Sequence, residues 1–145
     1  MNKNNNCIFC NPTNIIINGE YAYSRWDGFP VSRGHCLIIP KRHVNSIFEL
    51  TDNELKDLYT ILKQTYDYLI NFGYRMDGYN VGINCGKAAG QTVPHLHIHL
   101  IPRYKGDVFD PTGGVRGVIP DKQSYKPYVG DEDYEPDPYG IERDF

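Results

Sequence analysis

The segment from residue 95 to residue 101 constrains this chain most, because histidine and aliphatic side chains alternate along it. Its sequence is HLHIHLI, and Pro102 follows. Successive side chains of a β-strand point to opposite faces of a sheet, so the pattern predicts a strand with three imidazoles on one face. Each buried imidazole needs a hydrogen-bond partner or a metal ion. One such histidine is common in a core, whereas three in a row favour a functional site.

The rest of the sequence predicts an α+β domain with a mainly antiparallel sheet. Alternating or apolar runs between turn residues predict further strands at residues 21–26, 35–39 and 79–84. Thr51 and Glu54 form a capping box at the start of a helix, and apolar residues then recur every three or four positions up to Ile70. Gly73 is a suitable stop for this long helix. We expect one domain over residues 1–128.

A glycine-rich loop precedes the histidine strand. Gly86 and Gly90 allow backbone N–H groups to approach an anion closely, and Lys87, Gln91 and Thr92 add donors. An anion-binding loop that leads into a histidine strand indicates phosphoryl chemistry with a histidine nucleophile. A mononuclear metal site is the alternative, because two histidines two residues apart on a strand can bind zinc.

Charge and hydropathy limit the partners and the location of the protein. The formal net charge is −3, but seven acidic residues and one basic residue lie in residues 131–145, so basic residues are in excess before them. This excess suits a small phosphate-bearing ligand and is too weak for polymeric nucleic acid. No apolar run is long enough to cross a membrane and the first residues are polar, so we expect a cytoplasmic protein without membrane contact.

Two segments resemble the histidine-triad (HIT) family. Residues 90–103 read GQTVPHLHIHLIPR, which is similar to the family signature, and the similarity extends to GHCLIIPKRH at residues 34–43. The chain looks most like the fragile-histidine-triad branch, which hydrolyses dinucleoside polyphosphates. The resemblance implies a histidine-triad fold, in which one long helix and a short helix pack on a mainly antiparallel sheet. It also implies a homodimer.

The resemblance implies a role for each candidate residue of the site. His97 would attack the α-phosphorus of a nucleotide and form a covalent nucleotidyl-histidine intermediate. His99 would lie near the phosphate oxygens, and His35 would help to hold the ring of His97. The implied nucleotide-binding residues are Asp27 at the ribose, and Asn84, Gly90, Gln91 and Thr92 at the phosphates.

The implied activity is hydrolysis at the α-phosphate of a dinucleoside polyphosphate or a related nucleoside monophosphate derivative. Relatives that transfer nucleotidyl groups have Gln in place of the third histidine, so His99 favours water as the acceptor. Two alternatives are a nucleoside phosphoramidase and a nucleotide-binding signalling module with incidental turnover. The histidine mechanism needs no catalytic metal, and Mg²⁺ would enter only with the substrate.

Cys7 and Cys10 form a Cys-x-x-Cys motif near the N-terminus. In a cytosolic protein such a motif indicates a metal or redox site more often than a structural disulfide. Some members of the resembled family complete a zinc site with two histidines that correspond here to His43 and His95. The resemblance therefore implies a structural Zn²⁺ held by two thiolates and two imidazoles. The other cysteines, Cys36 and Cys85, are expected to be small buried apolar residues.

The segment of residues 129–145 is acidic and contains proline, so we expect a flexible tail. Deletion of residues 131–145 should leave the melting temperature and the turnover nearly unchanged, because few aliphatic side chains are lost. Thermal melting of the truncated and full-length proteins measures this. A fall of more than about 5 °C would instead show that Tyr134, Tyr139 or Phe145 packs on the body of the protein.

Overall fold

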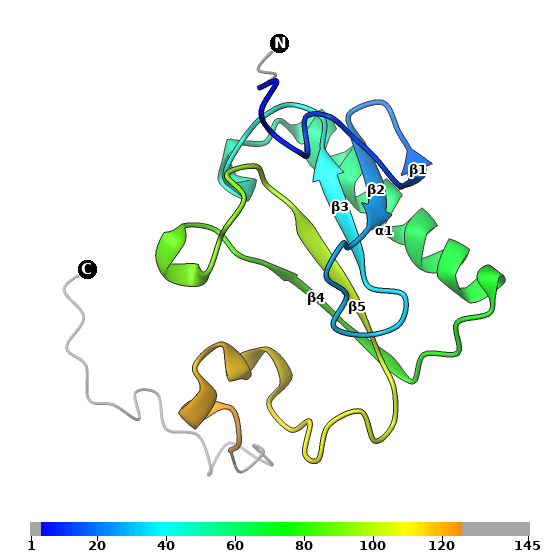
Figure 1. The fold of residues 1–145 in the computed structure, drawn as a ribbon, viewed down its shortest axis with the longest axis vertical. Helices are drawn as coiled ribbons and strands as arrows, with labels where there is room; N and C mark the ends of the chain where they lie inside the picture. Colours follow the sequence, from blue (N-terminus) through cyan, green and yellow to red (C-terminus); the bar gives the residue numbers. More distant parts are fainter. Residues whose placement is uncertain (1–3, 126–145) are drawn as a thin grey trace. The chain divides into compact units, whose positions relative to one another are not determined.

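The structure of the protein is a computed structural model, and it describes residues 4–125 (Figure 1). The chain forms two compact units, which divide between Phe109 and Asp110. The first unit carries the sheet and the long helix. The described part of the second unit carries two short 3₁₀ helices, at Gly114–Val118 and Pro120–Lys122. The expected acidic tail of residues 129–145 lies outside the described residues.

A five-stranded sheet forms the centre of the first unit (Figure 1). Its strands are β1 (Ile15–Asn18), β2 (Ala22–Trp26), β3 (Cys36–Pro40), β4 (Gly78–Ile83) and β5 (Ile98–Arg103). Their order in the sheet is β1-β2-β3-β5-β4, and all neighbours are antiparallel. The histidine-bearing strand therefore lies between β3 and β4. The predicted α+β fold with an antiparallel sheet is confirmed.

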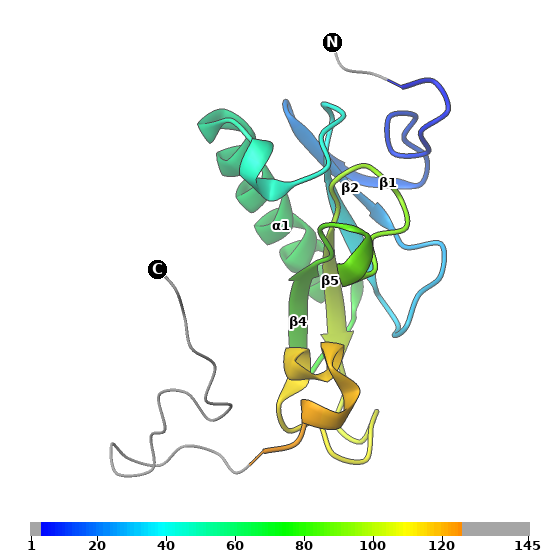
Figure 2. The ribbon, with the colours of Figure 1, turned by 90° about the vertical axis from the view of Figure 1, so that its left-hand side faces the viewer.

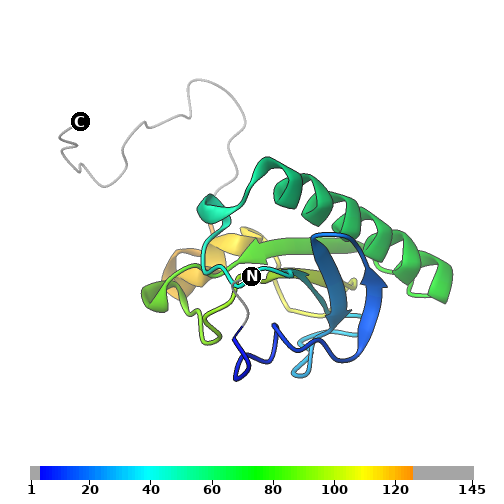
Figure 3. The same ribbon diagram turned by 90° about the horizontal axis from the view of Figure 1, so that it is seen from above.

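One long helix, α1 (Asp52–Phe72), covers one face of this sheet (Figures 2 and 3). The Thr51 hydroxyl accepts a hydrogen bond from the Glu54 N–H, and the Glu54 side chain accepts one from the Thr51 N–H, so the predicted capping box is present. Gly73 ends the helix with φ +109°, a left-handed conformation that glycine adopts without steric cost. The sequence therefore predicts both ends of α1 correctly.

The sheet separates two buried clusters of side chains. The cluster on the helix face includes Ala22, Cys36, Ile38, Leu58, Ile61, Leu69, Leu96, Ile98 and Leu100. The cluster on the other face joins the N-terminal segment to the sheet and comprises Cys7, Phe9, Cys10, Tyr23, Leu37 and Ile39. Figure 3 shows the helix and the N-terminal segment on opposite sides of the sheet. The aliphatic residues of the histidine segment thus face α1, as their alternation predicts. Cys36 is fully buried, whereas Cys85 is partly buried against the same core.

Strand β1 (Ile15–Asn18) is absent from the sequence prediction. It pairs with residues 23–25 of β2, and its register shifts between Ile15 and Asn18. The strand is four residues long and contains three consecutive isoleucines without alternation. Asn14 precedes it with φ +55°. Because this short edge strand is stabilised by its partner in the sheet, its own sequence carries little periodic signal.

Strand β5 begins later and ends later than the alternation predicts. It starts at Ile98 and includes Pro102, which was expected to end it. Pairing with β3 stops at Leu100, so β5 has only β4 as a neighbour at the position of Pro102. A proline without an N–H is tolerated where one side of a strand is unpaired. At the other end, the Leu96 N–H donates to the Val44 carbonyl oxygen at 2.6 Å, which draws the chain out of the ladder.

A single turn of 3₁₀ helix, η1 (Ile47–Glu49), precedes α1 and stands in place of the expected short helix. Ser46 and Glu49 form a second capping box around it. No helix in residues 4–125 is both long enough and apolar enough to cross a membrane.

Candidate functional site

The imidazole of His97 is held in one orientation by the backbone. Its Nδ1 lies 2.9 Å from the carbonyl oxygen of His95. A carbonyl oxygen only accepts hydrogen bonds, so Nδ1 carries the proton and Nε2 keeps a free lone pair. The ring packs against Phe9, with centroids 5.0 Å apart. The arrangement gives His97 the tautomer that a nucleophilic Nε2 requires.

His35 and His99 form a second, directly bonded pair. The backbone N–H of Val31 donates to Nδ1 of His35 at 3.1 Å, so the proton of the neutral His35 ring lies on Nε2. This Nε2 lies 2.9 Å from Nδ1 of His99 and 3.3 Å from Oδ2 of Asp27. Nδ1 of His99 is therefore an acceptor, and its own proton lies on Nε2. His99 can offer this N–H to a phosphate oxygen.

The position of His35 differs from the expectation in one respect. The resemblance implies that His35 holds the ring of His97, whereas the structure gives that contact to the backbone oxygen of His95 and pairs His35 with His99. Gly34, immediately before His35, has φ +87°, and a Cβ there would lie 3.2 Å from side-chain atoms of Pro102 and Tyr74. Position 34 therefore favours glycine, because the backbone passes close to Pro102 and Tyr74 in a left-handed conformation.

Both rings of the pair are neutral at physiological pH. Burial lowers the pKa of His35, and the Asp27 carboxylate only partly offsets this effect. Burial, followed by the neighbouring His97 and His35, lowers the pKa of His99 to about 4. A neutral His99 keeps the single Nε2 proton assigned above, so the hydrogen-bond directions of the site do not change near neutral pH.

The glycine-rich loop lies between β4 and β5 and is braced by Gln91. The Gln91 side-chain oxygen accepts a hydrogen bond from the Gly86 N–H at 2.8 Å, and its amide group donates to the Asn45 carbonyl oxygen at 3.2 Å. Gly86 and Gly90 have φ +89° and +88°, so both turns use conformations that glycine favours. Gln91 therefore shapes the loop, a role that the sequence does not reveal.

The remaining candidate residues of the loop, Asn84 and Thr92, lie on either side of the segment that Gln91 holds in place. Asn84 directly follows β4, whose last residue, Ile83, pairs with Ile98. The register therefore brings Asn84 beside His97, and the Asn84 side chain is half-buried. Thr92 is exposed. The structure thus brings Asp27, His35, His97 and His99 together and puts the glycine loop at the neighbouring strand end.

A second cluster joins Cys7, Cys10, His43 and His95 on the same side of the sheet. One ligand atom from each residue lies within 4.8 Å of the others. Nδ1 of His95 lies 3.4 Å from the Cys7 sulfur, 3.5 Å from the Cys10 sulfur and 3.2 Å from Nδ1 of His43. The Cys10 sulfur lies 3.2 Å from Nδ1 of His43. These four residues come from three separate segments of the chain.

The donor set and its geometry fit a tetrahedral zinc ion. Zn–S and Zn–N bonds of about 2.3 and 2.1 Å imply ligand atoms about 3.4–3.8 Å apart, close to the separations in the cluster. Nε2 of His95 lies 2.7 Å from the carbonyl oxygen of Pro40, so it carries the proton and Nδ1 offers its lone pair to the cluster. Such a second hydrogen bond is usual for zinc-bound histidine. Burial lowers the pKa of His95, which favours the neutral ligand form.

The sequence gives no sign of two further residues near the site. Phe9 lies within the Cys-x-x-Cys motif and contacts the rings of both His95 and His97. Arg25 is buried on β2 and its guanidinium lies over the Phe9 ring. An arginine in a predicted strand is ordinarily assigned to the exposed face, so only the packing of the N-terminal segment reveals its position.

Comparisons with known proteins identify the family of this chain. A model of the HIT domain family matches residues 9–106. An uncharacterised HIT-like protein of Methanocaldococcus jannaschii is 38% identical over 107 residues, which are 70% of this chain and 81% of that protein. An asymmetrical bis(5'-nucleosyl)-tetraphosphatase of Schizosaccharomyces pombe is 44% identical over 78 residues, which are 54% of this chain and 42% of that enzyme.

Solved structures show the same fold. The crystal structure of a Zn-bound histidine triad family protein from Mycobacterium smegmatis superposes with a TM-score of 0.64 and 32% identity, covering 72% of this chain and 80% of the other. A HIT family protein from Bacillus subtilis has a TM-score of 0.65 and 29% identity, and covers 90% of this chain and 87% of the other. The family match, the relatives and the paired histidines agree: this chain belongs to the HIT domain family.

Proposed function

We propose that this protein is a nucleotide hydrolase that cleaves at the α-phosphate of a dinucleoside polyphosphate or a related nucleoside monophosphate derivative. The observation that carries the proposal is the 2.9 Å contact between Nδ1 of His97 and the carbonyl oxygen of His95. It leaves Nε2 of His97 unprotonated and fixed in direction, as nucleophilic catalysis requires. The similarity to the tetraphosphatase of Schizosaccharomyces pombe supports the substrate class.

The proposed reaction has two displacements at phosphorus. The Nε2 lone pair of His97 attacks the α-phosphorus, an N–P bond forms, and the P–O bond to the leaving phosphate breaks with its electron pair on oxygen. The Nδ1–H of His97 still donates to the His95 carbonyl oxygen and so stabilises the positive charge on the ring. Water then attacks phosphorus, the N–P bond breaks, a proton passes to solvent, and the nucleoside monophosphate leaves.

The other residues of the site are proposed to bind the substrate. His99 donates its Nε2–H to a phosphate oxygen, and His35 holds it in that tautomer through the 2.9 Å contact at Nδ1. Asp27 accepts the Phe29 N–H on Oδ1 at 2.6 Å, and its remaining lone pairs can accept the hydroxyl groups of a ribose. Asn84, Gly90, Gln91 and Thr92 bind the phosphates, from the loop between β4 and β5.

Replacement of His97 by Ala should abolish turnover, with a fall in kcat of about 10³-fold or more, because no other group can form the nucleotidyl intermediate. His99→Ala should lower kcat less, because it removes a hydrogen-bond donor and leaves the nucleophile in place. Steady-state kinetics on diadenosine polyphosphates and adenosine phosphoramidates measures both variants and identifies the preferred leaving group.

Rapid quenching with a radiolabelled substrate tests the intermediate itself. The wild type should carry an acid-labile, base-stable label on the peptide that contains His97. Full activity of His97→Ala would disprove the mechanism. Equal losses at His95, His97 and His99 together with rapid inhibition by chelators would instead support a metal-dependent hydrolase.

We further propose that Cys7, Cys10, His43 and His95 hold one structural Zn²⁺. The support is the close approach of two sulfur and two nitrogen atoms, together with the hydrogen bond from Nε2 of His95 to a carbonyl oxygen. All four positions are taken by protein ligands, which is typical of a structural ion that supplies folding free energy rather than catalysis.

Metal analysis of the purified protein should find about one zinc per chain. Cys10→Ala should lower both the zinc content and the melting temperature, because it removes one of four ligands. Cys85→Ala is the matched control, since Cys85 lies outside the cluster, and it should keep the zinc. A fully folded wild type that contains no zinc and whose Cys7 and Cys10 react freely with thiol reagents would contradict the proposal.

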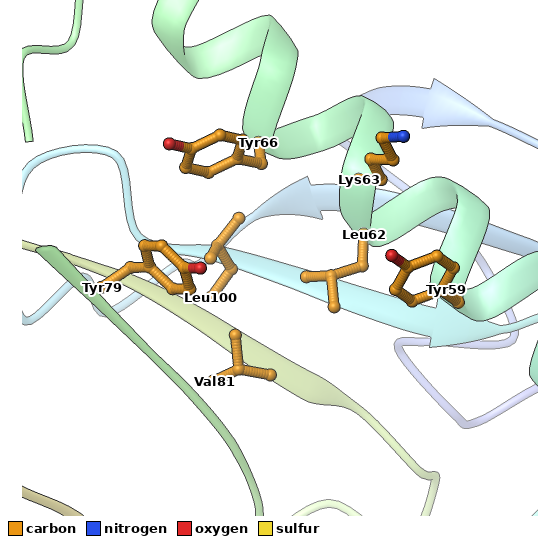
Figure 4. A pocket seen from close by; sticks show the side chains of 7 residues that line it. All are labelled: Tyr59, Leu62, Lys63, Tyr66, Tyr79, Val81 and Leu100. Carbon is orange, nitrogen blue, oxygen red and sulfur yellow. The ribbon is translucent and has the colours of Figure 1, made fainter.

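We propose a homodimer in which the β4 edge of the sheet meets the same edge of a second copy. In residues 4–125, β4 is paired on one side only, and it exposes the side chains of Tyr79 and Val81. A groove of about 170 Å³ lies between this edge and α1 (Figure 4). It is lined by Tyr59, Leu62, Lys63, Tyr66, Tyr79, Val81 and Leu100. An open edge beside exposed apolar side chains favours strand pairing.

Val81→Glu should convert the dimer to a monomer, because it puts a charge at the proposed contact. Ile15→Glu is the control on the opposite edge, where the side chain has similar exposure, 43% against 39% for Val81. Sedimentation equilibrium measures the mass of each variant. A wild type that is monomeric at micromolar concentration, or a dimer lost only in Ile15→Glu, would contradict the proposal.

A further inference from the structure

Arg25 is a buried cation that the proposed reaction does not use. Its side chain is 9% exposed, and no carboxylate of residues 4–125 forms an ion pair with it. Nε donates to the carbonyl oxygen of Trp26 at 3.0 Å, and Nη1 donates to the Thr13 hydroxyl at 3.3 Å. The guanidinium lies over the Phe9 ring, 5.7 Å from its centroid. These contacts fix its orientation without neutralising its charge.

The Nη2 end of Arg25 remains available to a ligand. Nη2 forms no hydrogen bond with residues 4–125. Among residues 4–125, Oγ of Ser32 is the only fully buried side-chain oxygen or nitrogen without a partner, so Nη2 keeps some contact with solvent although Arg25 as a whole is 9% exposed. A buried arginine with an accessible, unpartnered edge is well suited to bind acceptor atoms, because guanidinium only donates.

The register of the sheet puts Arg25 in one row with the histidine pair. Arg25 is opposite Leu37 in the β2–β3 ladder, and Leu37 is opposite His99 in the β3–β5 ladder. These three side chains therefore share one face of the sheet, and Leu37 belongs to the buried cluster on the face that is opposite α1. Paired Cα atoms lie about 5 Å apart, so the row places Arg25 about 10 Å from His99. Phe9 bridges the two ends, because it contacts both the guanidinium and the ring of His97.

The positions of the glycine loop and of Asp27 would orient a nucleotide along this row. The glycine loop of residues 86–90 follows β4, so polyphosphate bound there extends from His97 toward the β4 end. Asp27 follows β2, and its Oδ2 lies 3.3 Å from Nε2 of His35 and 3.8 Å from Nδ1 of His99, so its carboxylate lies at the His99 end of the row, on the side away from β4. A ribose held by Asp27, with its phosphate at His97, would direct its base along the row toward Arg25. The distance of about 10 Å along the row is comparable to the length of a nucleoside monophosphate.

We propose that Arg25 reads the edge of the nucleobase and gives the site a preference for guanine over adenine; this rests on the proposed function. Guanine presents two acceptors, N7 and O6, on the edge that arginine recognises, whereas adenine presents N7 and the donor N6 amino group. The fixed guanidinium therefore pairs with guanine and meets a second donor in adenine.

Isothermal titration calorimetry with GMP and AMP tests the preference apart from turnover. It uses the full-length His97→Ala variant, so that neither nucleotide reacts. GMP should bind about 5- to 150-fold more tightly than AMP, the range expected for one bidentate arginine–guanine contact. Adding Arg25→Met should bring this ratio close to one, mainly because it lowers the affinity for GMP. Arg25→Lys should also lose most of the ratio although it keeps the charge, because lysine lacks the planar fork.

Arg33→Met is the matched control. Arg33 is exposed and its guanidinium lies 4.9 Å from the centroid of the Tyr104 ring, so its loss should leave the GMP to AMP ratio unchanged. Thermal melting of all variants confirms that they are folded, and Arg25→Lys tests the proposal if Arg25→Met unfolds. Kinetics of the wild type on diguanosine and diadenosine tetraphosphates should show the same preference in kcat/KM.

Two results would overturn the assignment. Equal affinity of GMP and AMP shows that Arg25 does not read the base. Equal weakening of GMP, AMP and inorganic triphosphate by Arg25→Met shows that Arg25 binds phosphate. A failure of the proposed function would give a different result, because the wild type would then hydrolyse neither tetraphosphate and would form no label on His97. The ratio of GMP to AMP affinity measured by calorimetry would still report on Arg25.

Discussion

The two-residue repeat of side chains along the histidine segment is the constraint on which the site depends. Leu96, Ile98 and Leu100 pack under α1, and burying each such side chain contributes about 1.5–3 kcal/mol. A shift of register by one residue would turn these side chains away from α1 and put imidazoles against it. The stability of the helix-side core therefore fixes which way His97 and His99 face. Packing on one face of the sheet thus determines the geometry of the chemistry on the other.

The proton positions of the site follow from neighbouring backbone groups. Carbonyl oxygens fix the protonated nitrogen of His95 and of His97, and a backbone N–H fixes that of His35. The tautomer of His99 follows from that of His35, because Nδ1 of His99 must accept the proton on Nε2 of His35. Since burial lowers the pKa of both His35 and His99, this set of directions is stable near neutral pH. The rings are thus oriented by the fold before any substrate binds.

The sequence predicts those parts of the fold that depend on interactions within one segment of the chain. The capping box at Thr51, the stop at Gly73 and the alternation before Pro102 are each readable within one segment. Strand β1 and the passage of β5 through Pro102 depend on which neighbour is paired, which no single segment encodes. In the same way, the sequence marks the histidines, whereas the partner of His35 and the burial of Arg25 arise from contacts between distant segments.

His95 belongs to both clusters through different atoms: its ring faces the cysteines, and its carbonyl oxygen accepts the proton of His97. Every residue type has this carbonyl group, so the amino acid at position 95 can change in evolution without deleting the acceptor. The metal-ligating ring and the carbonyl acceptor for His97 can therefore be inherited separately. A lineage that lost its cysteines could replace His95 and still orient the nucleophile, provided that the bend of the chain at this position was preserved.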